Sequence, residues 1–411
     1  MKILTFLSLS AFLLLMGCKK EEDSSLTETF KVTIENVFEA KDFFQSGAID
    51  AIPPGGIVSF SFHAGKGHSL KFSSMIAQTN DIFIGPSDLG LKLYDVNGVA
   101  KTGDVTNEMI LWDAGTEVNE MPGSGPNQAP RQSSANTGQA ENGNVTPLAL
   151  INDGFTYPKI YELLQVSLTH DGGSLFTVTI ENTSTITSLT TPFAPGVWVV
   201  HSKDQFPLYK MDAKASPGLE KLAEDGNNSM MLMAIGDKSG LMSPYAPGAY
   251  SLGEGNDLFN VGSSAGMALE RLAEDGDPSG FEMIYNTPEG QSGPGPIFPG
   301  GAYSFTFTAE EGDNLSLALM LVQSNDWFMG LDNMPLFSNG IARVGDITSS
   351  MTLYDAGTEV DEYAGAGINQ PVRQSGGNTG MNENGQIAIE ANPSDNVPDV
   401  GQMIKVTLEL M

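Results

Sequence analysis

The chain has 411 residues, enough for two or more domains that each enclose a hydrophobic core. Its 20 basic and 50 acidic residues give a net charge of -30, and because such a surface repels phosphate backbones, nucleic acid is not an expected partner. The acidity instead fits a solvated extracellular protein or one that collects cations. With 40% hydrophobic residues and 21 phenylalanines the chain is not disordered, and its 47 glycines and 23 prolines indicate many turns between short strands.

The N-terminus resembles a bacterial lipoprotein signal peptide. Lys2 is followed by an apolar stretch over residues 3–16, and Gly17 stands directly before Cys18, the single cysteine of the chain. The apolar stretch is too short to remain as a membrane helix. The resemblance implies removal of residues 1–17 and lipidation of Cys18. An ordinary signal peptide with a chance cysteine is the alternative.

A charged tether, residues 18–29, follows the cleavage point and continues after the cysteine as Lys-Lys-Glu-Glu-Asp-Ser-Ser. It resembles the export signal that sends some bacterial lipoproteins to the outer face of the outer membrane. No later stretch reaches the roughly 18 apolar residues that a membrane helix needs. We therefore expect an outer-membrane lipoprotein that is exposed at the cell surface and held there by its lipid alone. The periplasmic face of that membrane is the alternative location.

Apolar and polar residues alternate in three matched pairs of segments, which is the pattern of half-buried strands. The pairs are 30–36 with 176–182 (FKVTIEN and FTVTIEN), 58–62 with 303–307, each after a Pro-Gly-Gly, and 164–168 with 404–408. In chain order, the first members of the three pairs open, continue and close one copy of a repeat, and the second members do the same for a second copy. The sequence thus predicts an all-β fold of two antiparallel β-sandwich domains, over residues 30–171 and 175–411.

The second copy is longer because of an insertion at about 191–296, which is itself doubled. Residues 194–226 and 246–276 both begin Ala-Pro-Gly and both end Leu-Ala-Glu-Asp-Gly. Before the first of these endings, Ser216 and Pro217 form a helix-start signal, and Gly226 is a helix-stop signal. We expect short helices in this insertion, and no counterpart of it in the first domain.

A polar loop segment is also repeated. Without gaps, residues 113–143 and 355–385 agree at 20 of 31 positions, and both begin Asp-Ala-Gly-Thr-Glu. Most of the shared residues are polar or glycine, whereas a repeated core would share apolar residues. A loop kept alike in two copies suggests a function carried out by the loop.

Carboxylates recur at matched places in this repeat. In each copy an aspartate ends one strand-like run, and an Asp-x-Gly-x-Glu follows about thirty residues later, which gives the sets Asp81, Asp113, Glu117 and Asp326, Asp355, Glu359. Three carboxylates that meet at the end of a sandwich would repel one another, and a hard cation such as calcium would relieve that repulsion. The aspartates could equally cap turns through their own backbone. The spacing alone leaves both interpretations open.

At this point the sequence resembles the spondin N-terminal domain family, which also occurs in bacterial lipoproteins. The resemblance covers most of residues 30–411 and is carried by SNDWFMG at 324–330, LYDAGTE at 353–359, GLEKLAEDG at 218–226 and YPKIYELLQVSL at 157–168. It implies an eight-stranded antiparallel sandwich that binds calcium with loops at one end.

Transferred by position, the resemblance implies the calcium ligands Asp326, Asp355 and Glu359. By repetition it also implies Asp81, Asp113 and Glu117, so that each domain would hold one calcium ion. The sequence departs from the family pattern in having Glu359 where the animal members have Asp, and Ile82 in the first copy in place of Trp.

Three functions are compatible with these features. The first is a cell-surface lipoprotein with two calcium-binding modules that acts in adhesion or in the capture of an extracellular protein or glycan. The second is a glycan-binding accessory protein of polysaccharide uptake, in which Trp198, Trp327 or Tyr250 would stack on sugars. The third is an enzyme of unrecognised type. Because no His-Glu-x-x-His or phosphate-loop motif occurs, we expect no enzymatic activity.

Overall fold

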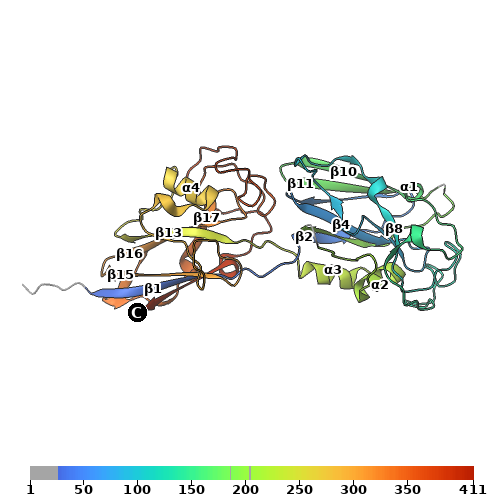
Figure 1. Ribbon diagram of the computed structural model, residues 1–411, viewed down its shortest axis with the longest axis horizontal. Coiled ribbons are helices and arrows are strands. Elements are labelled where there is room, and N and C mark those ends of the chain that lie inside the picture. The colour runs from blue at the N-terminus through green and yellow to red at the C-terminus, as the bar shows by residue number, and fades with distance from the viewer. Residues whose placement is uncertain (1–25, 186, 203–204) are drawn as a thin grey trace, which may run out of the picture.

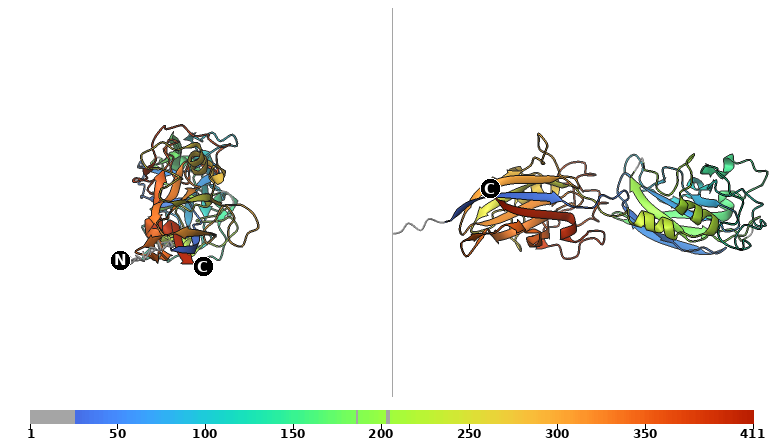
Figure 2. Two further views of the ribbon diagram at one scale, coloured as in Figure 1. Left: turned by 90° about the vertical axis from the view of Figure 1, so that its left-hand side faces the viewer. Right: turned by 90° about the horizontal axis from the view of Figure 1, so that it is seen from below.

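The computed structural model describes residues 26–185, 187–202 and 205–411. The predicted signal peptide, Cys18 and most of the tether lie outside these residues. The described chain is mostly antiparallel β-structure, so the predicted all-β sandwich fold is confirmed. Two bodies lie end to end along the long axis of the molecule (Figures 1 and 2).

The first body packs two sheets against each other. One is four-stranded, in the order β3 (Ile57–His63), β11 (Leu175–Asn182), β10 (Leu164–Gly172) and β7 (Gly103–Asp104). The other runs β2 (Gln45–Ile49), β12 (Gly196–Ser202), β4 (His68–Met75), β5 (Ile82–Gly85), β8 (Ile110–Asp113) and β9 (Thr146–Pro147), with β6 (Leu91–Lys92) also on β4. Two helices, α2 (Pro217–Asp225) and α3 (Ser229–Gly236), cover the outer face of this second sheet (Figure 1). A short helix, α1 (Ile160–Leu163), leads directly into β10.

The second body repeats this plan. Its four-stranded sheet has the order β15 (Ala302–Glu310), β1 (Thr27–Asn36), β23 (Ile404–Leu410) and β20 (Gly345–Asp346). Its six-stranded sheet runs β14 (Ile284–Tyr285), β13 (Tyr245–Gly253), β16 (Asn314–Leu321), β17 (Trp327–Pro335), β21 (Met351–Asp355) and β22 (Ala388–Ile389). Helix α4 (Met267–Asp275) corresponds to α2, and α5 (Val400–Met403) to α1; β18 (Phe337–Ser338) and β19 (Ile341–Ala342) form a small separate ribbon.

The strand pairing corrects the predicted domain boundaries of 30–171 and 175–411. β1, which was expected to open the first domain, pairs with β15 and β23 of the second body over its whole length. β11, which was expected to open the second domain, pairs with β3 and β10 of the first body. The first body is therefore one continuous segment, from β2 to α3, that is inserted into the second body between β1 and β13.

A tight hairpin is the physical reason for this arrangement. Only Gly173 and Ser174 separate β10 from β11, and two residues allow nothing but an antiparallel hairpin between neighbouring strands. Gly172 and Gly173 have φ angles of 108° and 55°, a region that glycine enters without steric cost. β11 is thus fixed beside β10, and its near-identical counterpart β1 fills the equivalent place in the other body.

The strand pairing also corrects the expectation that the doubled insertion belongs to the second domain alone. Its first half supplies β12 and α2 to the first body, and its second half supplies β13 and α4 to the second body. The expectation that the first domain lacks this segment was therefore wrong. Each body has one copy, and the expected short helices are present in both.

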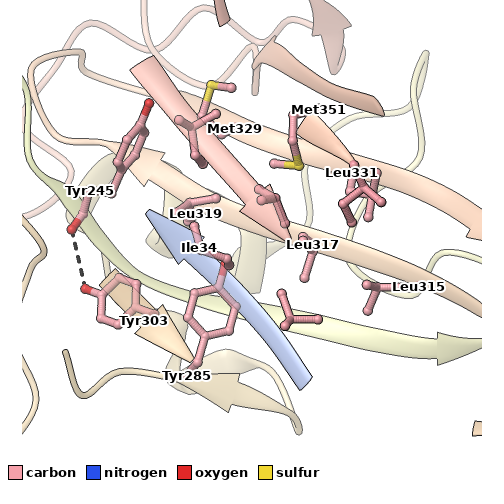
Figure 3. Close-up of a cluster of buried hydrophobic side chains, with 14 of the residues drawn as sticks. Ile34, Tyr245, Tyr285, Tyr303, Leu315, Leu317, Leu319, Met329, Leu331 and Met351 are labelled. Carbon is pink, nitrogen blue, oxygen red and sulfur yellow. Dashed lines mark hydrogen bonds between the residues drawn. The ribbon is translucent and has the colours of Figure 1, made fainter. Parts of the chain in front are cut away.

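β1 is an integral part of the second core although more than 200 residues separate it from its partners. Phe30, Val32 and Ile34 are completely buried, and Figure 3 shows Ile34 among the side chains of Leu317 and Leu319 from the opposite sheet. Fully burying such a side chain contributes about 1.5–3 kcal/mol. Burial of these three side chains therefore stabilises the packing of the N-terminal segment on the second body by several kcal/mol.

Candidate metal centre

Adjacent strands bring two of the predicted carboxylates together in the second body. Asp326 immediately precedes β17, Asp355 ends β21, and the two strands are antiparallel neighbours in which Trp327 lies opposite Asp355. Both aspartates therefore reach the same end of the sheet. The loop after β21 adds Asp361, and one carboxylate oxygen from each of the three residues lies within 4.8 Å of the others.

Loop amides hold the carboxylate of Asp326 from one side. Its Oδ2 accepts hydrogen bonds from the backbone N–H of Thr358 at 2.9 Å and of Glu359 at 3.0 Å, and from the Thr358 hydroxyl at 3.2 Å. Its Oδ1 is buried and accepts no hydrogen bond from any described protein group. A buried carboxylate oxygen without a donor is costly, which indicates that something other than a protein hydrogen bond stabilises it.

The other two carboxylates are also positioned by local contacts. The Oδ1 atom of Asp355 accepts from Gly357 N at 2.6 Å, a tight turn in which Gly357 has a φ of 65°. The Oδ1 atom of Asp361 accepts from the indole N–H of Trp327 at 2.6 Å. Because Trp327 is buried beside Asp326, this bond brings Asp361 back to the strand end.

The pKa values of all three acids are raised, because the carboxyl groups are buried close together. Burial, together with the negative charge of Asp355, raises the pKa of Asp326, and burial raises the pKa of Asp355. Burial and the charge of Asp355 raise the pKa of Asp361 to about 6. Two buried carboxylates at this separation cannot both carry a charge without a counter-ion, so they must retain a proton or bind a cation.

These three residues form an acidic triad that can hold a metal ion. The donor set is all oxygen, which suits a hard cation, and the buried Oδ1 of Asp326 accepts no hydrogen bond from the described residues. We use "acidic triad" below for Asp326, Asp355 and Asp361.

Glu359, the third predicted ligand, lies outside the acidic triad. Its Oε1 accepts from Gly380 N at 2.6 Å, and its Oε2 is buried without a described partner. Burial raises the pKa of Glu359, and the neighbouring Glu274 of α4 has its pKa raised by burial to about 7. Glu359 thus anchors the returning loop, while Asp361, two residues later, joins the two aspartates.

The first body builds the same scaffold with fewer charges. Asp81 Oδ2 accepts from Thr116 N at 2.7 Å and from Glu117 N at 3.1 Å, and Asp81 Oδ1 is buried without a described partner. Asp113 Oδ1 accepts from Gly115 N at 2.7 Å. Glu117, like Glu359, accepts from a glycine of the returning loop, Gly138 N at 2.7 Å.

Two substitutions separate the first body from the second. The position of Asp361 is occupied by Asn119, whose amide donates to Asp113 Oδ2 at 2.6 Å. The position of Trp327 is occupied by Ile82, whose side chain has no hydrogen-bond donor. Only two carboxylates meet here, and within the described residues the acidic triad of the second body is the one group of three or more acidic, histidine or cysteine side chains with metal-ligand spacing.

The repeated polar loop residues build the loop itself. Asn127 and Asn369 donate to Glu120 and Glu362 at 2.6 and 2.9 Å, and the backbone N–H groups of both asparagines donate to the same glutamates. The loop is also tied to the covering helix of each body. Gln132 donates to Asp225 of α2 at 3.2 Å and Gln374 to Asp275 of α4 at 3.1 Å. Each helix ends at a glycine in the left-handed region, Gly226 and Gly276.

Sequence comparisons add no assignment to this geometry. No protein-family model matches the chain, and no curated protein matches it in sequence. Within the described residues, no helix is long and apolar enough to cross a bilayer.

Proposed function

We propose that this protein is a surface-anchored lipoprotein that binds calcium at the acidic triad of its second body and acts in adhesion or in the capture of an extracellular macromolecule. The observation that carries the proposal is the meeting of three carboxylates, from two neighbouring strand ends and the loop after them, around a buried oxygen that has no described partner. The resemblance to spondin domains and the lipoprotein-like N-terminus support the extracellular setting.

Calcium is the ion that suits this set of ligands best. It takes six to eight oxygen ligands in irregular geometry, whereas magnesium demands a near-ideal octahedron and sheds its water reluctantly. Carboxylates supplied by a strand end, a turn and a loop form an irregular set. The ion would neutralise most of the formal charge of -3 of the ionised triad and replace the protons that burial otherwise retains there.

The first body is proposed to bind the same ion more weakly. Asp81 and Asp113 supply two negative charges instead of three, and Asn119 occupies one Asp113 oxygen as a hydrogen-bond donor. Affinity in calcium sites rises with the number of charged ligands. The expectation of one calcium ion per domain therefore becomes one tighter and one weaker site.

The partner is an extracellular protein or glycan, and the membrane is contacted through the lipid alone. β1 begins at the end of the second body that lies far from the first body (Figure 1), so a tether before it would place the second body next to the membrane. The repeated loop of the first body would then face outward. Stacking of sugars on Trp198 or Trp327 receives no support, because their exposed fractions are 9% and 2%.

Calcium titration of reciprocal variants by isothermal titration calorimetry tests the proposal. Asp361→Asn gives the second body the amide of the first, and Asn119→Asp gives the first body the carboxylate of the second. We expect the wild type to show a tighter and a weaker site, Asp361→Asn to lose the tighter one, and Asn119→Asp to strengthen the weaker one. A wild type that takes up no calcium at millimolar concentration would refute the proposal.

A further inference from the structure

The acidic triad lies next to the junction between the two bodies. The loops that follow β21 are at the end of the second body that faces the first body, whereas the matching loops of the first body are at the free end of the molecule (Figure 1). We propose that calcium binding to the acidic triad fixes the first body in place relative to the second. This inference rests on the proposed function and assigns a conformational effect to the same site.

The segment 361–365 connects the triad to the junction, and it is held on its inner side by the strand end that carries Asp326. Asp361 accepts the indole N–H of Trp327, and Glu362 N donates to the side chain of Asn325 at 3.1 Å. Gly365 N donates to the backbone oxygen of Gln323 at 2.8 Å. The position of this short segment is therefore set by the residues on either side of Asp326.

The same segment contacts the first body on its outer side. The ring of Tyr363 stacks on His63 of β3, with ring centroids 3.6 Å apart and an interplanar angle of 6°. Its hydroxyl accepts from Gln45 of β2 at 2.7 Å and donates to Asp395 at 2.5 Å. Gln45 in turn accepts from His63 N at 2.7 Å, so both first-body partners of Tyr363 are fixed to each other.

The two bodies also approach closely beside this contact. A Cβ atom on Gly65 of the first body would lie 2.6 Å from the backbone oxygen of Ala366 and would overlap the Arg373 side chain. A Cβ atom on Gly365 would lie 2.5 Å from the ring of Phe44, at the end of the segment that connects the bodies. The segment that leaves the triad is thus enclosed between the bodies.

Calcium acts on this junction through Asp361, which stands two residues before Tyr363. Without the ion, the charge repulsion within the triad is relieved either by protonation or by movement of the loop that carries Asp361. With the ion bound, Asp361 is held to Asp326 and Asp355, and Tyr363 is held in its stack on His63. The two chain crossings at residues 37–44 and 237–244 keep the bodies joined in both cases, so the ion changes the spread of their relative positions.

Spin-label distances between the bodies test this inference. Gln165 on β10 and Thr306 on β15 are exposed strand residues, and each can be replaced by a labelled cysteine in the full chain with Cys18→Ser. The distribution of label–label distances is measured by pulsed electron resonance in Ca²⁺ and in chelator. We expect a narrower distribution in Ca²⁺, and calorimetry on the same labelled protein records whether Ca²⁺ is bound.

Three variants separate the junction from the site. Tyr363→Ala and Gly65→Ala alter the junction and leave the three residues of the acidic triad in place. They should therefore still bind Ca²⁺, with an affinity lowered only by the coupling that is lost, but keep a broad distribution of label–label distances. Met121→Ala is the matched control, because Met121 holds the position of Tyr363 in the first body and is exposed at 52%. The distance distribution of this variant should narrow in Ca²⁺ as that of the wild type does.

The outcomes distinguish this inference from the proposed function. Ca²⁺ binding without narrowing in the wild type would overturn the junction proposal and leave the calcium site standing. Absence of Ca²⁺ binding would overturn both. Equal narrowing of the distance distributions of the wild type and of both junction variants would also contradict the junction proposal, because the effect of Ca²⁺ would then not depend on the contact of Tyr363 with the first body.

Discussion

Calcium should raise the melting temperature of the second body by several degrees, and Asp355→Asn should remove most of that rise. An ion that binds only the folded state at 100 times its dissociation constant adds about 2.7 kcal/mol of stability. Extracellular calcium modules bind at about 10⁻⁴–10⁻³ M, so about 10 mM Ca²⁺ reaches that excess for the tighter value. The second body comprises about 180 residues, and an unfolding entropy of about 2.1 cal/mol/K per residue converts this energy into a shift of about 7 °C.

The assay is differential scanning calorimetry of the full chain in Ca²⁺, in Mg²⁺ and in chelator. Mg²⁺ should give a smaller shift than Ca²⁺ because it retains its water. Asp355→Asn should hardly change the melt in chelator, because losing one acid also relieves repulsion within the triad. Asp113→Asn, the same change in the first body, is the matched control and should leave the calcium shift of the second body intact. A second body that melts at one temperature in all three solutions would refute the reasoning.

Three further predictions follow from the pKa values, the strand exchange and the N-terminus. Because the folded pKa values of Asp326 and Asp361 are raised, stability without calcium should fall as pH rises from about 4 through these values, while calcium affinity should rise. Equal calcium affinities at pH 5.5 and 7.5 would contradict this prediction, because the triad would then already be ionised at pH 5.5. Residues 45–236 should fold alone, whereas a chain that begins at residue 37 should lose the second body's melting transition because it lacks β1; an unchanged second transition would contradict the strand pairing. Cys18→Ala should abolish metabolic labelling with a fatty-acid analogue, and equal labelling of wild type and variant would exclude lipidation at this residue.

The strand pattern predicted the fold class but not how the strands are shared. FKVTIEN and FTVTIEN alternate identically and can line either core, so their likeness could not show which body each one joins. Chain order suggested the wrong answer. The deciding signal was local: Gly172 to Ser174 leave room only for a hairpin between β10 and β11. The insertion was misassigned for the same reason, because its two halves are contiguous in the chain and separate in space.

The candidate site could be predicted in part. Asp326 and Asp355 recur with their copies Asp81 and Asp113, the second of each pair before a glycine-containing turn, and repetition alone singled them out. Asp361 has no acidic copy, since Asn119 takes its place, so a search for repeated acids passed over it. Its position depends on a hydrogen bond from Trp327, which lies 34 residues earlier in the chain. A contact between residues so far apart in the chain cannot be inferred from the spacing of residues within one short segment.

The most direct test of the central claim is a crystal structure of the chain grown in Ca²⁺, with anomalous scattering used to locate the ion. We predict an anomalous peak from a Ca²⁺ ion that is bound by carboxylate oxygens of Asp326, Asp355 and Asp361, with the Oδ1 atom of Asp326 among its ligands. A triad that contains no ion at saturating Ca²⁺, with its carboxyl groups hydrogen-bonded to one another, would contradict this prediction.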